Sequence, residues 1–241
     1  SMAFLSPGAA ELRRLKAEAE HWIRQASRSG RQEQQAALPR GQREVFQLKI
    51  VLLDSKPPIW RRVLVPASIH LCSLNDVIQL AMGWQNDHLY QFVVGTQHEG
   101  LRYFGDTVLF DMDWWIQAKG QFVDDGRARL DHLLTQEKDW IRYVYDMGDG
   151  WNHRITLEKI LVEPMQQARI PRCIGGRRAC PPEDSGGVPG YERVLMIQAD
   201  PAHPEHGEIM EWLEELIDPA LFDCQAADAA LRAAFADTKD G

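Results

Sequence analysis

The sequence has few cysteines and no long apolar run. Its four cysteines, Cys72, Cys173, Cys180 and Cys224, are too few for a disulfide scaffold in 241 residues. No apolar stretch approaches the roughly 18 residues that a membrane span requires, and no signal-peptide pattern opens the chain. We therefore expect a cytoplasmic protein with reduced thiols and no membrane association.

Basic charge is also scarce. Lysine and arginine number 27 against 35 aspartates and glutamates, which gives a net charge of −8. Residues 199–241 hold eleven acidic and two basic residues (−9), so the first 198 residues, with 25 basic and 24 acidic, sum to +1. Neither part carries the basic field that non-specific DNA binding needs, so we expect no strong binding of this kind. The sequence identifies no specific partner.

Nucleotide-binding and common nucleophile motifs are missing as well. The chain contains no Walker pattern, no Gly-x-Gly-x-x-Gly and no Gly-x-Ser-x-Gly. The sequence therefore does not predict a P-loop enzyme, a dinucleotide-binding enzyme or an α/β-hydrolase.

Three regions are expected along the chain. The sequence predicts an N-terminal helix with an apolar stripe in residues 1–27. A linker nearly free of apolar residues is expected in residues 28–44, and the compact domain in residues 45–241. The stripe predicts docking on the same domain or on a symmetry mate, so a homo-dimer through this helix is one interpretation. It consists of Leu12, Leu15, Ala19, Trp22, Ile23 and Ala26.

The compact domain predicts an α+β fold. Apolar runs such as "VFQLKIVLLD" and "PIWRRVLVP" indicate paired strands, and Ser73 and Asp76 form a Ser-x-x-Asp capping box before a helix that ends at Gly83. Strands in adjacent pairs, without regular alternation with helices, favour a mainly antiparallel sheet with packed helices.

The stretch "YDMGDGWNHRI" predicts a hairpin. Asp149-Gly150 is a strong turn signal, and a loop of two or four residues places Asp146 and His153 on one face, together with Trp151. Two interpretations follow for Asp146 and His153. They form a structural hydrogen bond in the core, or they form an acid/base couple or part of a cation site.

A second unusual stretch, "PRCIGGRRACPPEDSGGVPGYERVL", predicts a long ordered loop. We expect it to fold back on the hairpin, so that Glu183 or Asp184 reaches Arg61, Arg62 or the region of His153. Arg61 and Arg62 are neighbours on a strand and must point to opposite faces. The catalytic candidates are Asp146, His153, Glu183 and Asp184, and the ligand-binding candidates are Trp60, Arg61, Arg62, His88, Asp149 and Trp151.

No cofactor is predicted. Cys173 and Cys180 are separated by six residues, which is not the spacing of a zinc knuckle, and both are typical of small buried residues that hold a loop. The alternative is zinc or another divalent cation bound by Cys173, Cys180 and His153, or by the two cysteines with His88 in place of His153.

Four motifs in order resemble the plasmid pRiA4b ORF-3-like family over roughly Val45 to Phe235. They are "KPPIWRRVLVP", "GWQNDHLYQFVV", "YVYDMGDGWNHRITLEKI" and "PRCIGGRRACPPEDSGGVPGY". The resemblance implies an α+β domain encoded near plasmids or insertion sequences. This chain differs from the family at Tyr90, Gly150 and Ser185, where the family often has histidine, aspartate and cysteine, respectively.

Two functions are therefore weighed. The first is a non-enzymatic binding or accessory module that grips a cation, peptide or small ligand in an acidic cleft containing histidine. The second is a hydrolase-like enzyme in which Asp146 orients His153 as the base, with or without a bound metal. The absence of a nucleophile or recombinase motif favours the first.

Overall fold

The computed structural model describes residues 38–39, 41–94, 101–104, 121–165, 170–213 and 215–236. The expected N-terminal helix and nearly all of the expected linker lie outside these residues. The first strand, β1 (Gln42–Leu52), begins three residues before Val45. The last three residues that we assigned to the linker therefore belong to the sheet.

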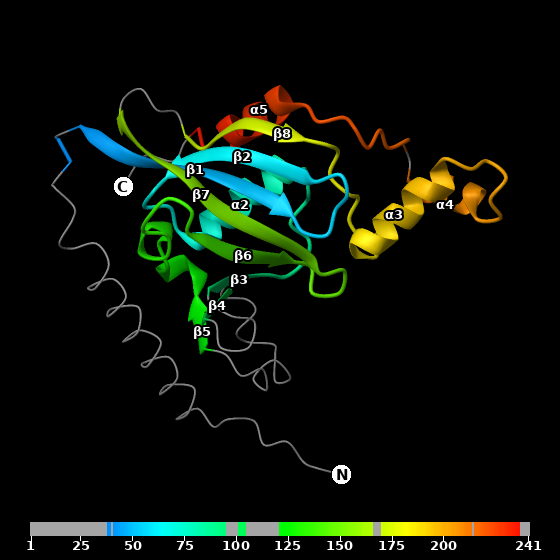
Figure 1. Ribbon diagram of the computed structural model, residues 1–241, viewed down its shortest axis with the longest axis horizontal. Coiled ribbons are helices and arrows are strands. Elements are labelled where there is room, and N and C mark those ends of the chain that lie inside the picture. The colour runs from blue at the N-terminus through cyan, green and yellow to red at the C-terminus, as the bar shows by residue number, and fades with distance from the viewer. Residues whose placement is uncertain are drawn as a thin grey trace, which may run out of the picture.

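The described strands form one eight-stranded sheet in the order β5-β4-β3-β6-β7-β1-β2-β8 (Figure 1). All neighbours are antiparallel except β4 and β5, which run parallel. The remaining strands are β2 (Ile59–Pro66), β3 (Tyr90–Val94), β4 (Leu101–Phe104), β5 (Gln121–Asp124), β6 (Trp140–Tyr145), β7 (Trp151–Pro164) and β8 (Arg172–Arg177). The α+β prediction with a mainly antiparallel sheet is confirmed.

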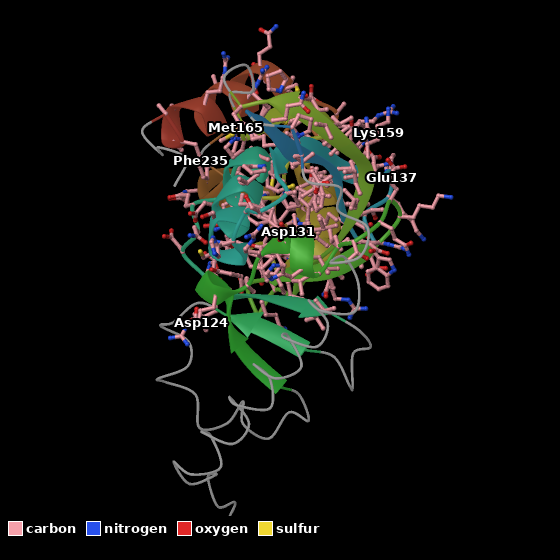
Figure 2. All side chains as sticks on the ribbon, turned by 90° about the vertical axis from the view of Figure 1, so that its left-hand side faces the viewer. Asp124, Asp131, Glu137, Lys159, Met165 and Phe235 are labelled. Carbon is pink, nitrogen blue, oxygen red and sulfur yellow. The ribbon has the colours of Figure 1, made fainter. Side chains whose placement is uncertain are left out.

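Helix α2 (Leu71–Met82) covers one face of the sheet, and α5 (Cys224–Ala234) packs beside it and against β8. Figure 2 shows Phe235, just beyond α5, on the side of the molecule where α2 lies, with Lys159 of β7 on the opposite side. Alternate residues of β2 point to the helical side, as a two-residue period requires. The core therefore lies between the central strands and α2.

The two ends of α2 can be compared with the helix start and the helix end that the sequence predicted. The helix ends at Gly83, which has a left-handed φ of 104°, as predicted. It begins at Leu71, after His70, which makes no capping hydrogen bond through its side chain. The predicted capping box is therefore wrong, because Ser73 already lies inside the first turn.

Two further helices, α3 (Gly187–Gln198) and α4 (His206–Trp212), lie together beyond one end of the sheet (Figure 1). The loop from β8 to α3 is the glycine- and proline-rich stretch. Within the described residues, no helix combines the length and the apolar character needed to cross a membrane.

Candidate cation site at the hairpin loop

The register of the central hairpin decides which side chains can meet. Tyr145 pairs with Trp151, so residues 146–150 form a five-residue loop, and His153 lies opposite Tyr143. The predicted loops had an even number of residues. An odd number exchanges the two faces of β6 relative to β7, because side chains alternate with period two. Asp146 and His153 therefore do not share a face, and the predicted hydrogen bond between them is wrong.

His153 lies inside the apolar core. Its side chain is fully buried and packs edge-on against Trp84, with ring centroids 5.3 Å apart, and against Tyr143 at 5.5 Å. Burial lowers the pKa of His153 to about 3, and the carbonyls of Trp151 and Tyr143 only partly offset this effect. The imidazole is neutral at pH 7 and exposes no surface to solvent, so it is not placed to act as a base.

Asp146 instead closes the hairpin loop. Its φ of 54° takes the backbone out of the strand, and its Oδ1 accepts a hydrogen bond from the Gly148 N–H at 2.8 Å. Its own N–H donates to the Leu89 carbonyl at 2.8 Å, which ties the loop to the segment before β3. These bonds leave Oδ2 facing the His88 ring, with His88 Nδ1 at 3.8 Å.

The glycine- and proline-rich loop returns to the hairpin, as predicted. The Gly186 N–H donates to Asp149 Oδ2 at 2.9 Å, and Asp184 Oδ1 lies 3.3 Å from His88 Nε2. Gly187 permits this approach, because its φ is 70° and a Cβ there would lie 2.4 Å from the Asp149 carbonyl oxygen. Glu183 does not reach an arginine. It accepts hydrogen bonds from the Tyr145 hydroxyl at 2.6 Å and the Gln85 N–H at 3.0 Å.

His88, Asp146 and Asp184 converge from three separate segments. One ligand atom from each lies within 4.8 Å of the others, an arrangement that can hold a metal ion. The side chain of Asp146 is 12% exposed, that of His88 29% and that of Asp184 70%, so the site opens to solvent on the Asp184 side. Among the described residues, no lysine or arginine pairs with either carboxylate.

The two arginines lie on opposite faces of β2, as predicted, but neither enters this cluster. Arg61 is buried and donates to the carbonyls of Ala81, Trp60 and Arg177. Its guanidinium stacks on Phe222 at 3.8 Å, and the Ala81 carbonyl belongs to the negative end of α2. The expected pairing of Arg61 with Glu183 or Asp184 is therefore wrong.

Arg62 points to the other face and pairs with Glu158 through two hydrogen bonds of 2.6 and 2.9 Å. Trp60 lies beside it, with the Arg62 guanidinium 5.1 Å from the ring centroid. Trp151 is fully buried and packs against Trp84. Of the predicted ligand-binding residues, only His88 belongs to the cluster, and Asp149 supports it through Gly186.

The cysteines do not form the alternative zinc site. The single group with metal-ligand spacing in the described residues is His88, Asp146 and Asp184, so Cys173 and Cys180 are not assembled with His153. All four thiols are free. Burial raises the pKa of Cys173 to about 11 and raises that of Cys180 as well, so both thiols are protonated near neutral pH.

Sequence reasoning missed the grouping of His88 with Asp146, and it missed Tyr145 as the residue that holds Glu183. The grouping of His88 with Asp146 follows from the odd length of the hairpin loop, which no residue pattern predicts. The role of Tyr145 could have been predicted from the alternation of side chains along β6. A tyrosine hydroxyl at the buried end of a strand requires a polar partner.

Known proteins share this fold and most of this chain. The sequence profile of a family described as plasmid pRiA4b ORF-3-like protein matches residues 44–226. The uncharacterised protein y4hQ of Sinorhizobium fredii is 38% identical over 172 residues, covering 70% of this chain and 80% of the relative. A solved structure of a protein of unknown function from Methanosarcina mazei Go1 has a TM-score of 0.64 and 32% identity, covering 76% of this chain and 97% of that one.

Proposed function

We propose that this chain, which belongs to the plasmid pRiA4b ORF-3-like family, is a non-enzymatic binding module that takes up a divalent cation at His88, Asp146 and Asp184. One imidazole nitrogen and two carboxylate oxygens suit a borderline divalent ion such as Mn²⁺ or Zn²⁺. Three protein ligands leave further positions open on the exposed side of Asp184.

The observation that carries the proposal is the convergence of the three ligand atoms within 4.8 Å. Two carboxylates at this separation repel each other, and within the described residues only the His88 ring faces both of them. A divalent cation would relieve this repulsion and bind one nitrogen of the His88 imidazole at the same time. The site also needs little reorganisation, because Asp146 is held through Gly148 and Leu89.

The hydrolase-like alternative loses its main residue. His153 is buried with a lowered pKa and is not oriented by Asp146, so it cannot serve as the base that this mechanism requires. Tyr145 is no substitute, because burial and the neighbouring Glu183 carboxylate raise the pKa of its hydroxyl. A binding role therefore fits the geometry better than catalysis by these groups.

Calorimetric titration of the full chain with Mn²⁺ and with Zn²⁺ tests the proposal. We expect one ion per chain and an affinity at least about tenfold lower for His88→Gln and for Asp146→Asn, because the first removes the imidazole ligand and the second removes the negative charge of a carboxylate ligand. Asp87→Asn is the matched control, since it removes the same charge from an exposed neighbour that is not part of the cluster.

The Asp87→Asn control distinguishes coordination of the ion by the three ligands from a general attraction of the ion to an acidic protein. If Asp87→Asn weakens binding as much as Asp146→Asn does, the ions are held by diffuse charge and the site is wrong. Absence of heat and of any rise in melting temperature with either ion would also reject the proposal.

A further inference from the structure

Residues 187–223, here called the arm, comprise α3, α4 and the segment that leads to α5. The arm is ordered internally. Gln198 on α3 exchanges two hydrogen bonds of 2.8 Å with the backbone of Ile217, and the Arg193 side chain pairs with Glu205. Helix α4, in contrast, has no buried residue, and it lies beyond the end of the sheet (Figure 1). One side of the arm therefore has no cover within the described part of the chain.

Large exposed apolar side chains are concentrated in the sequence of the arm. Met196 is 58% exposed, Trp212 42%, Leu216 71% and Leu221 63%, which makes four of the ten large exposed apolar residues in the described chain. Isolated exposed apolar residues are ordinary, but a concentration of them within 26 residues is typical of an interaction surface.

The same segment is strongly acidic. Residues 187–223 hold nine aspartates and glutamates against one arginine, a balance of −8. The single arginine, Arg193, is already engaged by Glu205. A partner that covers the arm must therefore bring apolar side chains together with positive charge.

The chain itself contains a segment with this chemistry. Residues 12–28 hold five basic residues and two acidic ones (+3), together with the apolar stripe that begins at Leu12 and includes Trp22. We infer that residues 12–28 of one copy dock through their apolar stripe on the arm of a second copy, and that the exchange is reciprocal in a two-fold dimer.

The position of β1 favours a second copy over the same chain. Figure 1 shows β1 starting at the left end of the sheet, whereas α3 and α4 lie beyond the right end. Fifteen residues separate Ala26 from Gln42. To reach the arm of its own chain, this connection would have to stretch along the longest axis of the molecule, which costs conformational entropy. A second copy can take up the position that requires no stretching.

A complementation experiment tests the docking. One full-length variant carries Leu15→Ser and Trp22→Ala in the N-terminal segment, and a second carries Trp212→Ala and Leu216→Ser in the arm. Sedimentation velocity should show a dimer for the unaltered chain, weakened by salt. Each variant alone should dissociate at least about tenfold more readily. An equimolar mixture should regain association, because the intact segment of one variant can dock on the intact arm of the other.

Val162→Ser is the matched control, since Val162 on β7 is 50% exposed and lies outside the arm. It should leave the dimer unchanged. Three results would overturn the inference. The first is an unaltered chain that is monomeric, as it would be if the segment docked within its own chain. The second is an arm variant that dimerises normally, which would indicate contact between two N-terminal segments. The third is a mixture of the two variants that fails to associate.

Discussion

Tyr145, the last residue of β6, donates its hydroxyl hydrogen to Glu183 Oε1 at 2.6 Å and so joins the central hairpin to the glycine- and proline-rich loop. The same hydroxyl oxygen accepts hydrogen bonds from the backbone N–H groups of Asp87 at 3.1 Å and His88 at 3.3 Å. One phenol therefore positions the segment that carries His88 and the loop that carries Asp184. Two of the three proposed cation ligands depend on it.

Tyr145→Phe tests this link. Removal of the hydroxyl leaves the Glu183 carboxylate with the Gln85 N–H as its remaining donor and deprives two N–H groups of their acceptor, so we expect the free energy of unfolding to fall by about 1–2 kcal/mol. Affinity for Mn²⁺ should fall too, because His88 and Asp184 lose their common support. Tyr90→Phe is the control. It removes another phenol that donates to a carboxylate, that of Asp125, at 2.5 Å, and it should cost stability without changing Mn²⁺ affinity.

Asp146 has two separable roles, and two substitutions distinguish them. Asp146→Asn keeps a side-chain acceptor for the Gly148 N–H and tolerates the φ of 54°, so the melting temperature should hardly change while Mn²⁺ affinity falls. Asp146→Ala removes the acceptor and leaves alanine with a left-handed backbone, so it should lower stability by about 1–2 kcal/mol. Urea unfolding of both variants checks this, and equal stability would show that the backbone is not strained there.

His153 should make the fold sensitive to acid. Its folded pKa of about 3 lies below the unfolded value of about 6.5, so well above pH 6.5, where neither state binds this proton, it contributes no pH dependence. Between these values the unfolded chain binds a proton that the folded chain does not, and stability falls as pH falls. The stability of His153→Phe relative to the unaltered chain should therefore rise by about 1.5 kcal/mol between pH 6.5 and pH 5.

Urea unfolding at the two pH values measures this change. If His153→Phe and the unaltered chain lose stability in parallel on acidification, the imidazole is accessible to protons in the folded state and the burial argument fails.

The two neighbouring arginines of β2 should respond very differently to lysine. In Arg61→Lys, the three carbonyls that now accept hydrogen bonds from the guanidinium have fewer donors, and the stack on Phe222 is lost. We therefore expect the free energy of unfolding to fall by about 2–4 kcal/mol. Arg62→Lys keeps a partly exposed pair with Glu158 and should cost less than about 1 kcal/mol. Chemical denaturation compares them, and equal losses would contradict the structural role of Arg61.

The central hairpin shows where residue patterns stop being sufficient. The sequence predicted its strands and its turn, because an apolar, aromatic-rich run on each side of Asp149-Gly150 has few alternatives. It did not predict the loop length. A change from four residues to five costs little locally, yet it moves Asp146 away from His153 and toward His88. Tyr145, Trp151 and His153 all pack against Trp84 on one face of the sheet, and this packing selects the register.

The sequence by itself determined the α+β class, the opposite faces of Arg61 and Arg62, the end of α2 at Gly83 and the return of the long loop to the hairpin. Each of these follows from a local preference: strand alternation, the left-handed backbone of glycine, and the stiffness of two prolines. Only the tertiary structure decided the partners. His88, Asp146 and Asp184 are brought together across almost one hundred positions of the chain, through the bonds that Glu183 and Asp149 make with other segments. Such contacts depend on the summed packing of all the elements, which no short stretch of sequence contains.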